Sequence, residues 1–304
     1  MKIFFLFLML MLGSLASKEQ LRITPVSPNQ TDAQINTFTT DRKMHVVYFD
    51  PLAVKRNELF LFLPGTNGTG FGAPELNKTA ALLGYHVLSL MYPDSIALAR
   101  YRELNNPEMY AQGREEIITG NDVSKEFNVT RANSIENRLI KLLLYLSDKY
   151  PTENWQQFLN RDMSIAWEKI AVAGQSQGGG HAAFIAKKHV VARVLMFASP
   201  KDYSTYFMAP ASWLSWISKT PVNRYFTFVH SDDGSNGCTY PQQVEIWSAM
   251  GLTANWVQVN VDSVSAPYLN SHILTSTKQQ SFPHGAVISD AGYREVWKYM
   301  MTAD

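Results

Sequence analysis

The sequence predicts an α/β fold with a mostly parallel central sheet and helices on both of its faces. Short runs rich in β-branched and aromatic residues alternate along the chain with longer helical patterns, an order typical of strand–helix–strand units. From the second run onward the apolar residues are nearly continuous, as in strands that are buried on both faces. With 304 residues, 46% of them hydrophobic, the chain can build one large core.

Seven apolar runs are predicted to be strands, because their composition favours strands and they end near glycine, proline or polar residues. These runs cover residues 45–50, 58–65, 86–93, 168–174, 192–200, 224–230 and 255–261. Stretches with apolar residues at helical spacing are predicted to be helices. They cover residues 73–84, 134–150, 179–189, 241–251 and 291–301.

One domain is predicted over residues 17–304, since no internal repeat or low-complexity linker divides the chain. Residues 94–133 interrupt the alternation of strands and helices because they are polar and rich in charge. We interpret this segment as an insertion. Two roles stay open for it: a cap over the functional site, or a long surface segment.

The first residues have the layout of a cleaved secretory signal: one early lysine, a continuous apolar run, and then the small residues Ser14 and Ala16. The apolar run is too short to span a membrane. We therefore expect residues 1–16 to be removed as a signal peptide, which would leave a secreted or extracytoplasmic protein without a stable membrane anchor. A short uncleaved anchor is the alternative.

Charge balance and cysteine content narrow the classes of partner. The net charge is +1, from 27 basic and 26 acidic residues, and no long basic run is present, so we expect no nucleic-acid partner. Cys238, the single cysteine, excludes an intramolecular disulfide and is interpreted as a spare thiol. The sequence contains no metal-binding, phosphate-loop or dinucleotide motif, so we predict neither a metal nor a cofactor. The oligomeric state is left open.

The motif that points to chemistry is Gly174-Gln175-Ser176-Gln177-Gly178, which fits G-x-S-x-G. A predicted strand precedes it and a predicted helix follows it, as in the turn that presents a nucleophilic serine. A serine hydroxyl needs a base to remove its proton, and that base needs an acid to orient it. We therefore predict that Ser176 is a nucleophile. The alternative is an ordinary serine in a glycine-rich turn.

An acid and a histidine follow Ser176 in the order that this kind of site requires. Asp233 comes after the predicted strand 224–230, and so belongs to the carboxyl edge of the sheet, where open α/β folds place their sites. His284 is expected in a loop before the last predicted helix. These three residues form a candidate catalytic triad.

With these residues in this order, the chain resembles the α/β-hydrolase superfamily over most of residues 17–304. Within that superfamily it is similar to a branch of exported hydrolases whose elbow reads S-Q-G-G-G-H. The resemblance implies Ser176 as the nucleophile, Asp233 as the acid and His284 as the base. It implies the fold strongly and the substrate hardly at all.

Alternatives stay open for the acid and the base. Asp232 is adjacent to Asp233, and Asp202 follows the predicted strand 192–200, where some members of the superfamily keep their acid. His272, expected in the same loop as His284, is the alternative base. We favour His284 because it immediately precedes the closing helix, as the histidine of the superfamily commonly does.

Attack by Ser176 on a carbonyl would place negative charge on an oxygen, which backbone N–H groups can stabilise. The amide of Gln177 is predicted to be one donor, since it follows the nucleophile at the start of a helix. A second donor is expected in the turn after the predicted strand 58–65, and we predict the amide of Thr66. Here Pro64-Gly65 stands in place of the commoner His-Gly pair, so the identity of this donor stays open.

Together, these motifs predict a secreted serine hydrolase that cleaves an ester, or an amide as the second choice, of a small molecule through an acyl-enzyme. Two alternatives stay open: a non-catalytic binding or adhesion protein on the same fold, and an acyltransferase or peptidase with the same triad. A binding protein of this kind would usually lack one member of the triad. Here all three residue types are present.

Overall fold

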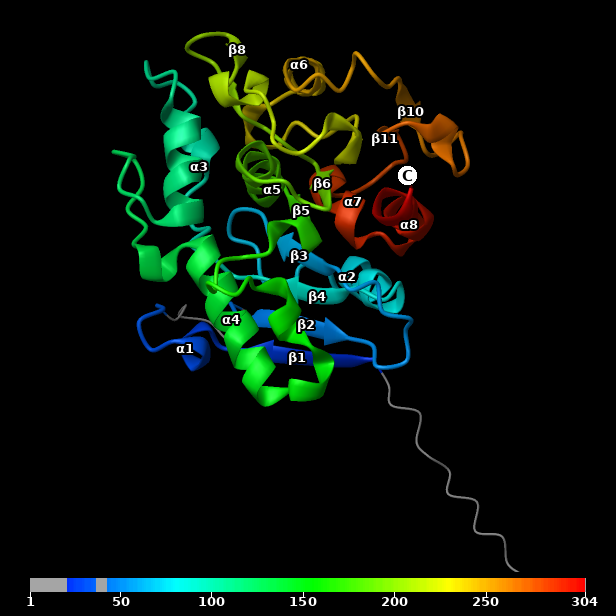
Figure 1. Cartoon of the computed structure of the whole chain (residues 1–304). Helices are drawn as coiled ribbons and strands as arrows, with labels where there is room; N and C mark the ends of the chain where they lie inside the picture. Colours follow the sequence, from blue (N-terminus) through cyan, green and yellow to red (C-terminus); the bar gives the residue numbers. More distant parts are fainter. Residues whose placement is uncertain (1–20, 37–42, 304) are drawn as a thin grey trace, which may run out of the picture.

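The computed structural model describes residues 21–36 and 43–303, which form a central sheet flanked by helices (Figure 1). The predicted signal peptide, residues 1–16, lies outside the described residues. Within the described part, no helix is long and apolar enough to cross a membrane.

The main sheet has nine strands within the described residues, and neighbouring strands from β4 to β10 run parallel. Strand β2 runs antiparallel to both of its neighbours, β1 and β4. In sheet order the strands are β1 (Arg22–Val26), β2 (His45–Phe49), β4 (His86–Ser89), β3 (Leu59–Leu63), β5 (Ile170–Gln175), β6 (Arg193–Phe197), β9 (Tyr225–His230), β11 (Ile273–Ser276) and β10 (Gln258–Asn260). A separate pair joins β7 (Tyr203–Ser204) to β8 (Ala209–Pro210).

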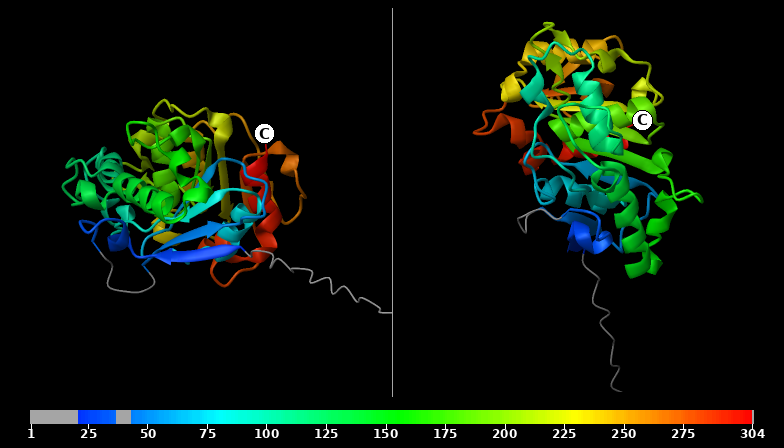
Figure 2. Two further views of the ribbon diagram at one scale, coloured as in Figure 1. Left: turned by 60° about the horizontal axis from the view of Figure 1, so that its bottom comes forward. Right: turned by 90° about the vertical axis from the view of Figure 1, so that its left-hand side faces the viewer.

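Helices cover both faces of the sheet (Figures 1 and 2). Buried residues of α3 to α6 share one core cluster, and those of α2, α7 and α8 share the other. Successive strand residues enter different clusters, so Leu61 packs in the first and Phe62 in the second. The helices are α1 (Pro28–Thr31), α2 (Pro74–Leu82), α3 (Met109–Thr119), α4 (Ile135–Lys149), α5 (Gln177–Lys188), α6 (Tyr240–Ala249), α7 (Pro283–Ser289) and α8 (Arg294–Thr302).

Helix α4 illustrates how the local sequence specifies an element. The Ser134 side chain accepts a hydrogen bond from the Asn137 N–H at 3.2 Å and so caps the first turn. Lys149 lies in the last turn, where a cation is favourable. Leu139 and Leu142 lie on the buried face against the sheet.

Each of the seven predicted strands overlaps a strand of the main sheet, whereas β1 and β11 of that sheet and the short pair β7 and β8 are not among those predicted. Strand β11 has only four residues between polar neighbours, which is too short for a clear pattern. It is inserted between β9 and β10. The predicted strand 255–261 therefore lies at the edge of the sheet, and β11 is the strand that precedes His284.

The segment 94–133 contains α3, which is not among the predicted helices. Its pattern is masked because Gly113, Arg114 and Glu116 are buried together with its apolar residues. Helix α3 packs against α4 and α5, on one face of the sheet (Figure 1). Polar residues on a buried helix face indicate specific partners, and Arg114 proves to have one near Ser176.

A mostly parallel sheet with helices on both faces, and a strand–turn–helix that carries a serine at its apex, define the α/β-hydrolase fold. The fold class predicted from the sequence is confirmed. Strands β5, β6, β9 and β11 run parallel, so their carboxyl ends lie at one edge of the sheet. The candidate residues lie at that edge.

Candidate active site

Ser176 occupies a sharp turn between β5 and α5. Its backbone has φ 55° and ψ −121°, which non-glycine residues rarely adopt, and strain of this kind clusters at functional sites. The Ser176 N–H donates to the carbonyl of Phe197 on β6 at 2.9 Å. The strained turn is therefore anchored to the neighbouring strand, at the carboxyl end of the sheet.

Two glycines of the motif let β5 and α5 approach each other closely. A Cβ on Gly174 would collide with the backbone of Gly178 and Gly179, and a Cβ on Gly178 would collide with the carbonyl group of Leu63. These obstacles are backbone atoms, which cannot rotate away as a side chain can. The glycines flanking Ser176 are therefore required by packing, and they hold the serine in its turn.

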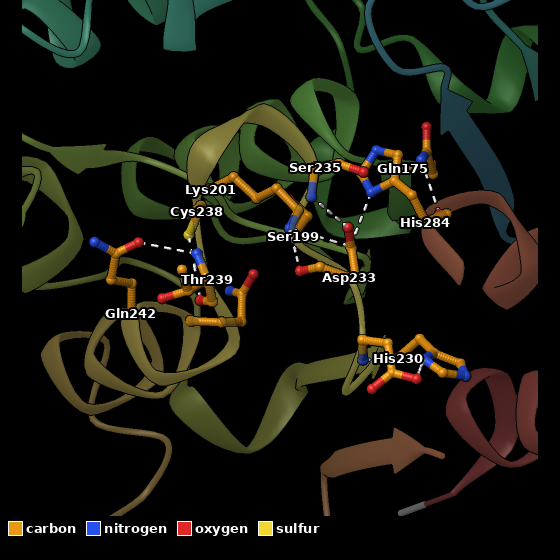
Figure 3. Close-up of polar contacts among 12 residues, drawn as sticks. Gln175, Ser199, Lys201, His230, Asp233, Ser235, Cys238, Thr239, Gln242 and His284 are labelled. Carbon is orange, nitrogen blue, oxygen red and sulfur yellow. Dashed lines mark hydrogen bonds and ion pairs between the residues drawn. The ribbon is translucent and has the colours of Figure 1, made fainter. Parts of the chain in front are cut away.

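His284 and Asp233 are in direct contact, with Nδ1 of the ring 2.8 Å from Oδ2 of the carboxylate (Figure 3). Asp233 follows β9 as predicted, but His284 does not lie in a loop: it is in the first turn of α7. The proline at the start of α7 favours this turn, because proline is preorganised for the first helical position. The Gln175 side-chain amide donates to the carbonyl of His284 at 3.2 Å and ties α7 to β5.

The Asp233 carboxylate is buried and strongly held in its ionised form. Burial alone would raise its pKa, but the hydrogen bond from His284 and the charge of Lys201 outweigh burial and lower the pKa of Asp233 to about 2. Oδ1 accepts a further hydrogen bond from the Ser235 N–H at 3.0 Å. An ionised carboxylate at Nδ1 favours the ring tautomer that leaves the Nε2 lone pair able to accept a proton.

Lys201 was not among the predicted site residues, yet its ammonium lies 3.1 Å from Oδ2 of Asp233 (Figure 3). It follows β6, and Asp233 follows the neighbouring strand β9, so both residues lie past the carboxyl ends of adjacent strands. Lysine after a strand is usually exposed, and the sequence carries no sign that this one is buried. Lys201 could be placed next to Asp233 only once β6 and β9 were known to be neighbouring strands.

The alternative acids are engaged elsewhere. Asp202 is buried and forms a two-point ion pair with Arg114 of α3, at 2.6 Å to Nε and 2.5 Å to Nη2. The same carboxylate accepts from the Trp213 ring N–H at 2.8 Å. The Asp232 side chain is 73% exposed and contacts His230, not His284. Of the three carboxylates, Asp233 is the one that contacts the candidate base.

His272 does not share a loop with His284, so that expectation is wrong. It directly precedes β11, is buried, and its ring stacks between Phe226 and Trp256, with centroids 3.8 Å and 4.1 Å away. Nδ1 contacts the carbonyl of Tyr225 at 3.1 Å. Burial lowers the pKa of His272 to about 4, which is expected for a neutral ring in the core.

Ser176 and His284 line the same cavity, which has a volume of about 550 Å³. The other lining residues come mainly from the turn after β3 and from α7, and they include Thr66, Phe282 and Ile288. A cavity of this size is within the usual range for small-molecule sites. The elements that build it therefore bring the predicted nucleophile and the predicted base to one concave surface.

The two predicted oxyanion donors belong to α5 and to the turn after β3. Gln177 is the first residue of α5, and Thr66 lines the cavity in the turn after β3. Their side chains are in contact, since the Thr66 hydroxyl donates to Oε1 of Gln177 at 3.2 Å. Over residues 21–36 and 43–303, neither backbone N–H has an acceptor within the protein. An amide without an acceptor in the protein can donate to a bound oxygen, as an oxyanion hole requires.

No group of three or more histidine, cysteine, aspartate or glutamate side chains in the described residues is arranged to hold a metal ion. Cys238 is buried, and burial raises the pKa of its thiol to about 11. A thiol with so high a pKa is mostly protonated at neutral pH, as expected for a spare cysteine.

The fold and this site together define the class, an α/β-hydrolase-fold protein with serine, histidine and aspartate at the carboxyl edge of its sheet. No protein-family model and no curated protein sequence matches the chain. Among solved structures it is similar to a putative dienelactone hydrolase from Klebsiella pneumoniae subsp. pneumoniae MGH 78578, at 8% identity and a TM-score of 0.44, over 93% of this chain and 100% of that chain.

It is also similar to a mutant feruloyl esterase module from Clostridium thermocellum complexed with sinapinate, at 12% identity and a TM-score of 0.45, over 92% of this chain and 87% of that chain. Similarity at this level carries no argument about the reaction or the substrate. The fold assignment rests on the strand order and on the turn that carries Ser176.

Proposed function

We propose that the protein is a serine hydrolase that cleaves an ester bond of a small, uncharged molecule through an acyl-enzyme. One observation carries the proposal: Ser176 and His284 line the same cavity, while Asp233 is hydrogen-bonded to the far side of the His284 ring at 2.8 Å. A nucleophile, a base and an orienting acid in this relation are the parts of a serine triad.

In the proposed first step, Nε2 of His284 accepts the hydroxyl proton of Ser176 as the serine oxygen attacks the ester carbonyl carbon. Negative charge moves to the carbonyl oxygen, towards which the amides of Gln177 and Thr66 donate. The dipole of α5 adds to this stabilisation, because its amino end faces the new charge. Asp233 stabilises the protonated ring throughout.

Collapse of the tetrahedral intermediate breaks the bond between the carbonyl carbon and the alcohol oxygen, and the leaving alcohol takes the proton from His284. The acyl group is then bonded to Ser176. Water transfers a proton to His284 and attacks the acyl carbon in the same way. Release of the carboxylic acid returns the proton to the serine oxygen and completes the cycle.

The cavity lining supports an uncharged, partly apolar substrate. Phe62, Phe282 and Ile288 contribute apolar surface, and within the described residues the lining includes no aspartate, glutamate, lysine or arginine. A charged substrate would lose its hydration without gaining an ion pair, which is costly. An acyl or aryl group that contacts these side chains gains from the burial of apolar surface.

The test uses purified protein that lacks residues 1–16, a panel of acyl esters graded by chain length, and a fluorophosphonate probe that reacts with activated serines. We expect hydrolysis of neutral esters and labelling of the wild type. Ser176→Ala is expected to lose both while its melting temperature stays close to the wild-type value, because the change removes one oxygen and little packing. Ser147→Ala, on α4, serves as the control and should label fully.

Activity retained by Ser176→Ala at about a tenth of the wild-type rate or more would reject Ser176 as the nucleophile. A wild type that is folded but neither labels nor hydrolyses would favour a binding or adhesion protein. Transfer of the acyl group to an added alcohol in preference to water would identify an acyltransferase, and cleavage of amide substrates alone would identify a peptidase.

We also propose that the protein is exported, because residues 1–16 have the layout of a cleaved signal. Expression of the full chain with fractionation tests this proposal: the mature protein should be found outside the cytosol with its first residue near position 17. Full-length protein retained in the cytosol would contradict export.

A further inference from the structure

Lys201 is a buried lysine whose ammonium contacts the same carboxylate oxygen as His284. Its Nζ lies 3.1 Å from Oδ2 of Asp233, and the ring Nδ1 of His284 lies 2.8 Å from that oxygen (Figure 3). The Lys201 side chain is 6% exposed. Within the described part of the chain, its hydrogen-bond and ion-pair partners are both atoms of Asp233, the carboxylate and the backbone carbonyl at 3.5 Å.

The neighbouring residue in sequence does not neutralise Lys201. Asp202 is directed towards Arg114 of α3, which binds it at two points, and towards the ring N–H of Trp213. Two buried ion pairs therefore lie side by side, one per carboxylate. A buried ammonium needs acceptors or a counter-charge, and Asp233 supplies both to Lys201.

The groups that face Asp233 come from three elements. His284 is on α7, Lys201 follows β6, and the Cys238 thiol precedes α6 and is protonated at neutral pH because burial raises its pKa to about 11. Near α3, the positive charge of Arg114 and the negative charge of Asp202 neutralise each other. Lys201 is thus the lysine whose ammonium lies against the triad carboxylate.

We propose that Lys201 is a positioning residue of the triad: it holds the Asp233 carboxylate in place and limits how strongly that carboxylate stabilises a protonated His284. The consequence is that a neutral side chain at position 201 would let Asp233 interact more strongly with a protonated His284 ring. This inference rests on the proposed function for its effect on turnover. The ion pair itself and its effect on the ring can be measured whether or not the protein turns over an ester.

The first measurement is an NMR titration of the His284 ring in the wild type and in Lys201→Met, which removes the charge and keeps all but one atom of the side chain's length. Loss of a cation that lies 3.1 Å from Oδ2 of Asp233 is expected to move the titration midpoint of the ring upward by about one pH unit or more. The acid limb of the kcat/KM profile should move to higher pH by the same amount. Lys201→Arg keeps the charge, and a small adjoining cavity of about 20 Å³ can accommodate part of the larger head group, so both midpoints should stay at their wild-type values.

Lys187 provides a matched control. It is also a buried lysine, and it lies near the carboxyl end of α5, away from the triad. Its Nζ donates to the carbonyls of Leu214 at 2.8 Å and Trp216 at 2.6 Å. Lys187→Met should change stability without moving the ring titration. An equal shift in Lys187→Met, or no shift in a folded Lys201→Met, would overturn the proposal.

A second measurement keeps the proposal testable if Lys201→Met does not fold. Asp233→Asn leaves the Lys201 ammonium buried without a charged partner, whereas Asp233→Asn with Lys201→Met removes both charges. The double variant should therefore have a higher melting temperature than Asp233→Asn alone. A double variant no more stable than the single one would refute the ion pair. If the wild type lacks esterase activity, the proposed function fails while these two measurements still decide the role of Lys201.

Discussion

At the residue scale, the three aspartates near Ser176 differ in what each carboxylate contacts, and this difference separates their effects on activity and stability. Asp233→Asn should lower kcat by about four orders of magnitude, because an amide favours the wrong ring tautomer at His284. It should also lower stability, since it leaves Lys201 without a charged partner. Activity assays and thermal unfolding of the same variant measure the two effects.

Asp202→Asn should destabilise the protein by about 3 to 5 kcal/mol, because it leaves the buried Arg114 charge without its partner. Its kcat per folded molecule should fall far less than that of Asp233→Asn. Asp232→Asn, at a side chain that is 73% exposed, should change neither quantity much and serves as the control. If Asp202→Asn has the largest effect on kcat, the acid of the triad follows β6 and not β9.

Replacing His284 should mainly affect activity, whereas replacing His272 should mainly affect stability. His284→Ala is expected to lower kcat at least about a thousandfold, as loss of a triad base does. His272→Ala should act mainly on stability, because the ring fills the space between Phe226 and Trp256. Steady-state kinetics with thermal unfolding distinguishes the two, and a larger kcat loss in His272→Ala would move the base to that residue.

At the scale of elements, the site depends on the close packing of α5 on β3 and β5. Gly178→Ala should sharply reduce the melting temperature or the yield of folded protein, because the new Cβ collides with the carbonyl group of Leu63. Gly234→Ala is a suitable control for stability, since a Cβ there meets no atom within 4 Å. Equal melting temperatures for the two variants would mean that the strand and helix separate at little cost.

At the scale of the whole molecule, buried neutral histidines make stability depend on pH. Burial lowers the pKa of His45 to about 3, and that of His86 and His272 to about 4. Each ring is protonated near pH 6.5 in the unfolded chain but not in the folded one, so the unfolded state takes up more protons below that pH. Stability should therefore fall as the pH drops from 6.5 towards 4, by up to about 1.4 kcal/mol per pH unit for each ring.

Asp233 adds a second loss at lower pH, because its folded pKa of about 2 lies below the value of an unfolded aspartate, and the stability it contributes disappears as the pH falls through that range. Calorimetry between pH 7 and pH 4 measures the first loss. His45→Gln should make this pH dependence shallower by about one proton. A melting temperature that stays constant over this range would contradict the account of the buried rings.

Local patterns were sufficient for the fold class and for the turn at Ser176, whereas the choice of Asp233 and His284 over their alternatives relied on the resemblance to the α/β-hydrolase superfamily. The fold class and the turn follow from short stretches: continuous apolar runs, helical spacing, and two glycines without which β5 and α5 could not approach. Local patterns were insufficient for β11 and α7. Both elements are short, and their stability comes from neighbours distant in sequence.

Long-range packing decided the electrostatic surroundings of the site. Lys201 and Arg114 look like ordinary polar residues along the chain, yet the adjacency of β6 to β9 buries one against Asp233 and the packing of α3 buries the other against Asp202. The same packing separates the three aspartates into a triad acid, a structural ion pair and an exposed carboxylate. Burial strengthens each charge interaction by excluding water, and burial is a property of the folded arrangement that no single stretch of sequence contains.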